Sequence, residues 1–557
     1  MKLVVIGGVA GGMSAAARAR RLDESAEIVV LERGSYVSFA NCGLPYFVGG
    51  EIADESSLLL QTPETLKASL NLDVRINHEV TACDFDAKKL TVSTPNGIST
   101  ISYDKLVISP GGKAINVLPE GSSSEHVHML RTVDDARALR NYALKGGAAV
   151  VIGAGFIGLE AVEAFMHRGF ETHLVELADH VLPPLERELA TTVQLHLESA
   201  GMQIHTQTKA TELHDEGGKA HVRLSSGETI AADVVVMAVG VRPDTEVFTR
   251  AGLKHDRGAL LTDEHGRTNK PDVYAVGDAV ISVSAATGAA GVVALAGPAN
   301  RAGRLVADHI FCPQTARTLP SVMGTAIVRA GDLTAAMTGA NRAQLERANI
   351  EYTTIHVHPT QHAGYFPGAS MIDLIVHFCP NTGKILGAQA LGTEGVDKRI
   401  DVISTAMRSG LSVSDLIDLD LSYSPPYGSA KDAVNMAGMV GENVLTGKLK
   451  LIYVEDIVNL PADSVVLDVR TRTEFESGHL PGAINIPHTE LRGRLKELQE
   501  KAQGRKLAVM CAAGVRSWIA YCVVKAAGYD AQMLSGGMRT LVQWLGAEAD
   551  RVLVTGE

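Results

Sequence analysis

The sequence has few aromatic residues, few cysteines and no long apolar run. Aromatic residues make up only 4% of 557 residues, a composition that fits glycine- and alanine-rich α/β units whose backbones approach each other closely. The six cysteines are scattered and too few for a disulfide scaffold, so we expect a reducing cytoplasm in which any special cysteine does chemistry. Because no apolar run reaches the ~20 residues of a transmembrane helix, no membrane partner is expected.

An excess of positive charge is also missing. The 51 basic and 63 acidic residues give a net charge of −12, which argues against a nucleic-acid partner held by electrostatics. The length predicts three to four domains at about 150 residues each. A hydrophobic content of 46% predicts packed cores rather than disorder.

The beginning of the chain predicts a strand, a glycine turn, a helix and a second strand. Residues 2–6 read KLVVI, as in a parallel strand buried on both faces, and a second apolar strand ends at Glu32. In such a βαβ unit the helix N-terminus holds a pyrophosphate and the acidic residue binds a ribose hydroxyl. The glycine fingerprint is imperfect because Val9 takes its third position. The predicted nucleotide-binding residues are Gly7, Gly8, Ala10, Gly11, Gly12 and Glu32.

The same unit recurs after an apolar strand at 148–152. This copy has the complete G-x-G-x-x-G fingerprint at Gly153, Gly155 and Gly158, and its acidic residue is Glu176. Two such units predict two dinucleotides. The carboxylate of Glu176 would repel a 2′-phosphate, so NADH is expected rather than NADPH.

Two more segments link the halves of the chain. Residues 234–244 read VVVMAVGVRPD and residues 268–279 read TNKPDVYAVGDA. With these motifs the chain resembles the two-dinucleotide flavoprotein disulfide reductase family. In that family the Gly-Asp pair, here Gly277 and Asp278, holds the ribityl and phosphate region of FAD. The resemblance also implies cofactor contacts at Arg33, Gly240 and Ala296.

The last hundred residues form a different module. Asp468-Val469-Arg470, Glu474-Phe475, the segment 478–483 and the Cys511 loop occur in the order of a rhodanese domain, which this part resembles. A six-residue loop, Cys511 to Arg516, closes as a cradle of backbone N–H groups that stabilises a thiolate or a persulfide. The similar cysteine loop of phosphatases is longer, so a loop of six residues favours a sulfur substrate over a phosphate. Arg516 is expected to add positive charge and brace the loop, and Asp468 and Arg470 to hold the fold.

The fold class predicted for the whole chain is therefore α/β, with two Rossmann-like dinucleotide-binding domains, an α+β dimerisation domain and a C-terminal α/β rhodanese domain. A homodimer is implied. The predicted domains are a first FAD-binding half at 1–115, an NAD(P)-binding domain at 116–245, a second FAD-binding half at 246–320, a dimerisation domain at 321–446 and a rhodanese domain at 452–557.

A single cysteine occupies the flavin-side segment. Disulfide reductases of the family carry Cys-x4-Cys there, whereas residues 38–46 contain only Cys42. Such a thiol must form a mixed bond with another thiol or be oxidised by peroxide. The pattern resembles the coenzyme A disulfide reductases and, more loosely, NADH oxidases and peroxidases. We expect a helix N-terminus and the flavin to lower the pKa of Cys42.

Further residues are predicted to complete the site. Ser14, Arg18 and Arg21 share one helix face, which is suited to phosphates or is merely a solvated basic face. The resemblance implies that they bind the phosphates of coenzyme A together with Ser38, Asn41 and Lys431. It also implies that Tyr365 and Tyr423 reach the site from the partner subunit and hydrogen-bond or donate a proton to the departing sulfur. They are otherwise core or interface aromatics, and Tyr427 is an available substitute for Tyr423.

A histidine cluster invites a metal site, which we do not expect. His356 and His358 share a strand face, but Pro359 interrupts the run before His362 and the sequence places no cysteine or carboxylate among them. No metal is predicted for the chain.

These patterns predict an NADH-dependent flavoenzyme that reduces coenzyme A persulfide, polysulfide or coenzyme A disulfide. Cys42 would be the flavin-side thiol, and Cys511 would carry a sulfane sulfur and exchange it with a small-molecule thiol. Two alternatives stay open. One is an NADH oxidase or peroxidase that cycles Cys42 through a sulfenic acid. The other is a sulfur carrier or redox sensor with little turnover.

Overall fold

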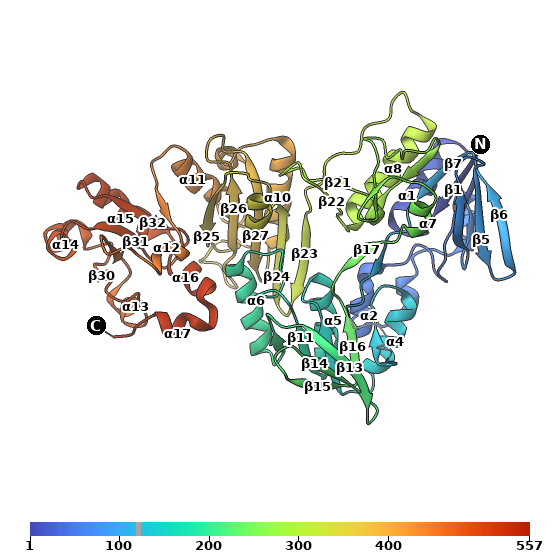
Figure 1. The fold of residues 1–557 in the computed structure, drawn as a ribbon. Helices are drawn as coiled ribbons and strands as arrows, with labels where there is room; N and C mark the ends of the chain where they lie inside the picture. The colour runs from blue at the N-terminus through green and yellow to red at the C-terminus, as the bar shows by residue number, and fades with distance from the viewer. Residues whose placement is uncertain (118–123, 557) are drawn as a thin grey trace. The chain divides into compact units, whose positions relative to one another are not determined.

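The computed structural model describes residues 1–117 and 124–556 and divides into two compact units (Figure 1). The first unit comprises residues 1–179 and 202–324, and the second comprises residues 180–201 and 325–557. The chain therefore leaves the first unit for 22 residues and returns to it. The segment 180–201 lies within the range predicted for the NAD(P)-binding domain, and residues 118–123 of that range lie outside the described residues.

The first unit contains a five-stranded parallel sheet in the order β20-β7-β1-β2-β3. Its strands are β1 (Lys2–Ile6), β2 (Glu27–Leu31), β3 (Asp73–Arg75), β7 (Lys105–Ile108) and β20 (Val273–Ala275). In β1, Leu3 lies opposite Ile28 on one side and Lys105 on the other. The strand order therefore reverses at β1, and folds of this kind bind ligands where the order reverses, beyond the carboxyl end of the central strands.

Both faces of this sheet are covered. Leu3 and Val5 pack with helices α1 (Ala10–Leu22) and α8 (Ala296–Phe311). Val4 and Ile6 pack on the antiparallel strands β4 (Glu79–Asp84), β5 (Lys89–Thr94) and β6 (Gly97–Ser102). The buried strand predicted at 2–6 is thus the central strand of a sheet that lies between a layer of helices and a layer of antiparallel strands.

A second parallel sheet has the order β12-β11-β10-β16-β9. Its strands are β9 (Val127–His128), β10 (Ala148–Ile152), β11 (Glu171–Val175), β12 (Gln203–His205) and β16 (Val234–Met237). Helix α5 (Phe156–Met166) follows β10. The antiparallel strands β13 (Ala210–Glu216), β14 (Lys219–Leu224) and β15 (Thr229–Ala232) pack on this sheet through an apolar cluster.

The second unit begins with an antiparallel sheet in the order β23-β24-β27-β26-β25. The strands are β23 (Ala326–Ala330), β24 (Leu333–Gly339), β25 (Thr353–Val357), β26 (Asp373–Phe378) and β27 (Ile385–Gly392). Helices α10 (Val396–Ser409) and α11 (Ala433–Leu445) share its apolar core. Helix α6 (Arg187–Ser199), formed by the segment 180–201, belongs to this unit.

A parallel sheet in the order β28-β32-β31-β29-β30 completes the second unit. Its strands are β28 (Leu451–Ile452), β29 (Ser464–Asp468), β30 (Ile484–Asn485), β31 (Lys506–Met510) and β32 (Ala531–Leu534). Helix α15 (Val515–Ala526) follows β31, and helix α16 (Gly537–Leu545) follows β32. The α/β class and the change of architecture near residue 450 agree with the prediction. Within the described residues, no helix combines the length and apolarity needed to cross a membrane.

Candidate active site

The first glycine turn is shaped by close backbone contacts. Gly7 adopts φ +100°, and a Cβ there would lie 2.0 Å from the carbonyl oxygen of Ser109. A Cβ on Gly12 would lie 2.0 Å from the carbonyl oxygen of Gly7. Only glycine therefore lets β1 turn into α1, which begins at Ala10 and directs its first N–H groups away from the sheet.

Two acidic side chains hold the two turns in the same way. Glu32 accepts hydrogen bonds from the N–H groups of Gly8 at 2.7 Å and Gly34 at 2.8 Å. Glu176 accepts them from Ala154 at 2.7 Å and Ala178 at 2.8 Å. The repeat read from the sequence thus extends to individual hydrogen bonds.

The second turn has its own steric requirement. Gly153 adopts φ +102°, with a Cβ position 2.6 Å from the carbonyl oxygen of Ala238, and a Cβ on Gly158 would lie 1.8 Å from the carbonyl oxygen of Gly153. At Gly155, in contrast, a Cβ would meet nothing within 4 Å. This glycine leaves open space at the start of α5, as a bound pyrophosphate requires.

The remaining predicted cofactor residues lie in the first unit. Gly277 (φ +80°) and Asp278 form a short 3-10 turn between β20 and α8. Burial raises the pKa of the Asp278 carboxyl, and the nearby Arg131 guanidinium opposes that rise. Arg33 forms an ion pair with Asp244. Gly240 adopts φ +111°, and Ala296 is the exposed first residue of α8.

Cys42 lies in the 3-10 turn Asn41–Gly43, which leads into helix α2 (Leu44–Gly49). This segment is fastened to the first glycine turn, because the N–H of Ser38 donates to the carbonyl of Gly8 at 2.8 Å. The Cys42 side chain is exposed. Protein atoms crowd it enough to raise the pKa of its thiol by desolvation, and the Glu160 carboxylate raises it further. In the polypeptide alone the pKa of Cys42 is therefore raised, whereas its expected lowering by a helix N-terminus together with the flavin stays a prediction.

The two predicted tyrosines meet in the second unit. The hydroxyl groups of Tyr365 and Tyr423 are hydrogen-bonded at 3.3 Å, although 58 residues separate them. Both side chains are exposed, and so is Tyr427. The hydrogen bond raises the pKa of Tyr365. The pair presents two phenol groups to whatever approaches this surface.

The basic stripe on α1 is partly neutralised. Arg18 is bound through Nε to Asp308, and the Ser14 hydroxyl donates to Asn300 at 2.7 Å. Arg21 is exposed in the last turn of α1. Asn41 is exposed in the first unit and Lys431 in the second. Arg21 is therefore the exposed cation of the predicted stripe.

Cys511 directly follows β31 and is 1% exposed. Its Sγ accepts a hydrogen bond from the Gly514 N–H at 3.2 Å, and its thiol lies 3.3 Å from the Ser517 hydroxyl. Gly514 adopts φ +107° at the start of α15, which turns the loop back toward the sulfur. The backbone cradle predicted from the spacing is formed on at least this one amide.

Arg516 is braced by a carboxylate. Its guanidinium donates to both oxygens of Glu474, each at 2.7 Å, and this contact lowers the pKa of Glu474 to about 2. Glu474 also caps helix α13 (Arg472–Glu476) through Thr471. The charge of Arg516 is thus shared between Glu474 and the Cys511 loop. Asp468 and Arg470 form a buried ion pair.

The histidines of the rejected metal site are in fact contacted by carboxylates. His356 Nε2 lies 2.7 Å from Glu188, and His358 Nδ1 lies 2.7 Å from Asp373. The sequence-based statement that no carboxylate supports them is wrong, because both acids come from distant segments. Arg342 also pairs with Glu188, and Arg539 with Asp373. These carboxylates therefore already have cationic partners.

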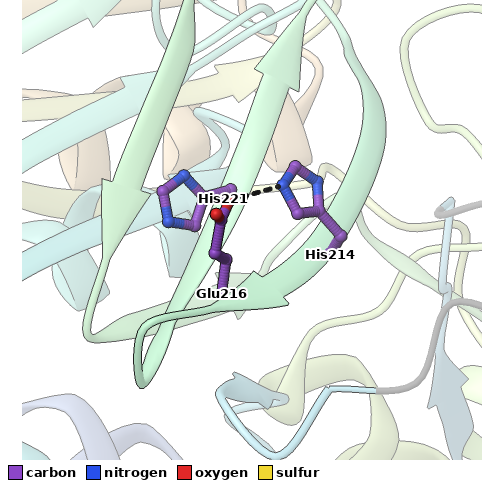
Figure 2. A group of neighbouring side chains, drawn as sticks. All are labelled: His214, Glu216 and His221. Carbon is purple, nitrogen blue, oxygen red and sulfur yellow. Dashed lines mark ion pairs between the residues drawn. The ribbon is translucent and has the colours of Figure 1, made fainter.

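Another group of possible metal ligands lies on the hairpin of β13 and β14. Figure 2 shows His214, Glu216 and His221 on this hairpin. Their ligand atoms all lie within 4.8 Å of one another, and His214 Nε2 lies 3.7 Å from the Glu216 carboxylate. Glu216 also faces Lys219 across the hairpin. We assign no metal to this exposed group.

The sequence assigned no role in the site to three residues that lie near Cys42 or Cys511. Glu160 follows the second fingerprint on α5, but nothing local indicates its proximity to Cys42. Ser517 directly follows the predicted loop Cys511 to Arg516, and its hydroxyl was not among the predicted site residues. Glu474 belongs to a Thr-x-x-Glu capping box, which the sequence displays plainly; its contact with Arg516 spans 42 residues.

The geometry therefore shows two dinucleotide-type turns and places Cys42 and Cys511 in separate loops, and comparisons with protein families assign the chain to a class. The model of the pyridine nucleotide-disulphide oxidoreductases matches residues 1–303, that of their dimerisation domain matches 325–434, and that of rhodanese-like domains matches 454–543. The chain belongs to the flavin-dependent pyridine nucleotide-disulphide oxidoreductase family and carries a rhodanese domain. The predicted family, fold class and enzyme class are confirmed.

Individual proteins of the family are similar to this chain over most of its length. The chain is 32% identical over 442 residues to coenzyme A disulfide reductase of Staphylococcus haemolyticus, covering 78% of this chain and 98% of that one. The structure of reduced Bacillus anthracis CoADR-RHD is 39% identical with a TM-score of 0.95, covering 99% of both chains. A NAD-dependent persulfide reductase from A. fulgidus is 35% identical with a TM-score of 0.90, covering 97% of this chain and 100% of that one.

The family uses a flavin and NAD(P)H, and the residues present fit such groups. Each turn follows a central parallel strand and excludes side chains by backbone contact. Each ends at a helix N-terminus suited to a pyrophosphate. The carboxylate of Glu32 beside the first turn and that of Glu176 beside the second each lie at the position where a ribose hydroxyl binds in this fold.

Proposed function

We propose that the protein is an NADH-dependent reductase of coenzyme A persulfide, polysulfide or coenzyme A disulfide. Cys42 is the thiol beside the flavin, and Cys511 carries sulfane sulfur. The observation that carries the proposal is the position of Cys42, a lone cysteine in a segment fastened to the first glycine turn by the Ser38–Gly8 hydrogen bond. The named activities of the relatives from Staphylococcus haemolyticus and A. fulgidus support it.

The first turn, with Gly277 and Asp278, holds FAD, and the second holds NADH. The Cys42 thiolate attacks the inner sulfur of coenzyme A persulfide, forms a mixed disulfide with coenzyme A and expels hydrogen sulfide. Bound FAD and NADH supply the two electrons that, with one proton, return the Cys42 thiolate and free coenzyme A. Tyr365 and Tyr423 of the partner subunit of a homodimer hydrogen-bond the departing sulfur.

The rhodanese domain prepares the substrate. The Cys511 thiolate takes the outer sulfur of a donor persulfide and releases the donor thiol. Coenzyme A then takes that sulfur from Cys511 as its own persulfide. Coenzyme A is held by Ser38, Asn41, Lys431 and the α1 stripe, in which the exposed Arg21 contributes more than Arg18, whose charge Asp308 already offsets.

The test is anaerobic NADH oxidation with coenzyme A persulfide, followed by sulfide release. We expect Cys42→Ser to abolish turnover. Cys511→Ser should retain reduction of coenzyme A disulfide but lose reactions that start from a bulky sulfur donor. Cys522→Ser, on the exposed side of α15, is the matched control and should behave as wild type.

Three results contradict the proposal. Unchanged sulfide release by Cys42→Ser excludes its central step. Oxygen or peroxide consumption that outpaces sulfide formation favours an oxidase or peroxidase. NADH use that stops after one equivalent favours a sulfur carrier or redox sensor.

A further inference from the structure

Helix α16 has a polar face that is buried against the antiparallel sheet of the same unit. Arg539 and Gln543 are four residues apart in the helix and so share one side of it, and Ser535 lies two residues before the helix begins. The Ser535 hydroxyl and His356 Nδ1 are hydrogen-bonded at 2.7 Å. The Thr540 hydroxyl and His358 Nε2 are also hydrogen-bonded at 2.7 Å.

Asp373, the first residue of β26, is the centre of this contact. It is 2% exposed. It accepts hydrogen bonds from Arg539, from Gln543 at 2.6 Å and from His358 Nδ1 at 2.7 Å. The donors that Asp373 meets are buried or half-buried, and each contacts its carboxylate directly, so the arrangement tolerates little displacement of α16.

The same helix holds the Cys511 loop at its N-terminus. The N–H of Met538 donates to the carbonyl of Cys511 at 2.8 Å, and the N–H of Arg539 donates to the carbonyl of Ala512 at 3.0 Å. In a trans peptide the N–H points opposite to the C=O. The two loop carbonyls therefore face α16, and the following N–H groups, of Ala512 and Ala513, face away from it.

We propose that His358 and Asp373 are positioning residues for sulfur loading of Cys511. They fix α16 through Thr540 and Arg539, and α16 fixes the peptide groups that form the cradle. The inference rests on the proposed role of Cys511 as a sulfur carrier. The helix itself does not depend on these contacts, because Met538, Leu541 and Leu545 pack into the core of the rhodanese domain.

The test compares Thr540→Val, which keeps the shape and loses the hydroxyl, with Thr540→Ser, which keeps the hydroxyl. Full-length protein is mixed with inorganic polysulfide, and loading is followed by rapid alkylation and mass spectrometry. In this step the Cys511 thiolate takes one terminal sulfur and leaves a polysulfide one atom shorter. We expect loading to be about tenfold slower in Thr540→Val, since His358 loses a buried partner, and wild-type in Thr540→Ser.

A second variant approaches the same contact from the other side. His358→Asn should slow loading by a similar factor, and the double variant should be no slower than the slower single variant, because both remove one interaction. Reduction of coenzyme A disulfide through Cys42 should not change in any variant. Both tryptophans, Trp518 and Trp544, lie in the rhodanese domain, so their fluorescence shows whether that domain is folded. If Thr540→Val unfolds the rhodanese domain, the loading rate of His358→Asn tests the positioning role instead.

The outcomes separate the two proposals. A wild-type protein whose Cys511 takes up no sulfur overturns the proposed function. A wild-type protein that loads, with both single variants loading at the same rate, overturns the positioning role and leaves the proposed function standing. Additive slowing in the double variant also contradicts a shared contact.

Discussion

The hydroxyl of Tyr46 donates a hydrogen bond to the carboxylate of Glu160 at 3.2 Å. Tyr46 lies four residues after Cys42 in the chain. Desolvation and the charge of Glu160 together raise the pKa of the Cys42 thiol. The polypeptide thus keeps this thiol protonated to higher pH than a free cysteine, which limits its reaction in the absence of cofactors.

Replacing Glu160 by Gln should therefore lower the pKa of Cys42, though not fully, because desolvation is the larger cause. We expect alkylation of Cys42 by iodoacetamide at pH 7 to be about two- to fivefold faster. The rate is measured from pH 6 to 10 in a Cys511→Ser background. Glu171→Gln, an exposed change on β11, is the control. A pKa that rises or stays constant would show that Glu160 does not act on the thiol.

The glycine at the start of α16 offers a steric prediction. Gly537 adopts φ +67°, and a Cβ there would lie 2.5 Å from the carbonyl oxygen of Cys511. Gly537→Ala should cost about 1–2 kcal/mol in backbone strain and also displace the loop, slowing sulfur loading. Gly528→Ala has φ +90° and nothing within 4 Å of its Cβ position, so it should cost stability without slowing loading. Equal loading rates in the two variants would show that a Cβ at Gly537 does not disturb the Cys511 loop.

The proposed preference for NADH depends on the charge of Glu176. Glu176→Gln keeps a carbonyl that accepts from a backbone N–H but removes the negative charge. We expect the ratio of kcat/KM for NADH over NADPH to fall by about tenfold, because the repulsion of a 2′-phosphate is lost. Steady-state rates with both nucleotides measure this ratio, and Glu171→Gln should leave it unchanged. An unaltered ratio in Glu176→Gln assigns the preference to another residue.

Asp373 should make stability depend on pH. Burial alone would raise the pKa of this carboxyl, but hydrogen bonds from His358 and Arg539 hold it below its usual range. A lowered pKa stabilises the fold above the unfolded value of about 3.9, and this contribution is lost as the pH falls below it. Asp373→Asn should therefore cost about 3–5 kcal/mol at pH 7.

Urea unfolding followed by tryptophan fluorescence measures this effect for the rhodanese domain. The difference between wild type and Asp373→Asn should shrink as the pH falls from 5 to 3. Asp463→Asn, which breaks an exposed pair with Lys506, should leave the stability almost unchanged at every pH, because exposed ion pairs contribute little. A difference that does not vary with pH would mean that the charge of Asp373 is not what stabilises the contact.

The sequence predicted those features that local spacing determines. The turns around Gly7 and Gly153 and the Cys511 loop are each encoded within a dozen residues, because backbone geometry there requires glycine. Pairings between distant segments were not predictable. Arg18 meets Asp308 across 290 residues and His356 meets Glu188 across 168, and a single sequence carries no local signal for either. The charge that Glu160 places near Cys42 was not predictable for the same reason, since the two residues approach each other only in the folded chain.

The crossing of α1 and α8 bears on how the chain folds. A Cβ on Gly303 would lie 2.1 Å from the carbonyl oxygen of Gly11, so these backbones meet although about 290 residues separate them in sequence. Strand β20 likewise joins the first sheet only after residue 272 has been made. On the ribosome the first nucleotide-binding fold must therefore wait with an open sheet edge while the inserted domain, whose contacts are more local, completes itself. Synthesis begins with the sheet that contains β1, but that sheet is not the first to finish.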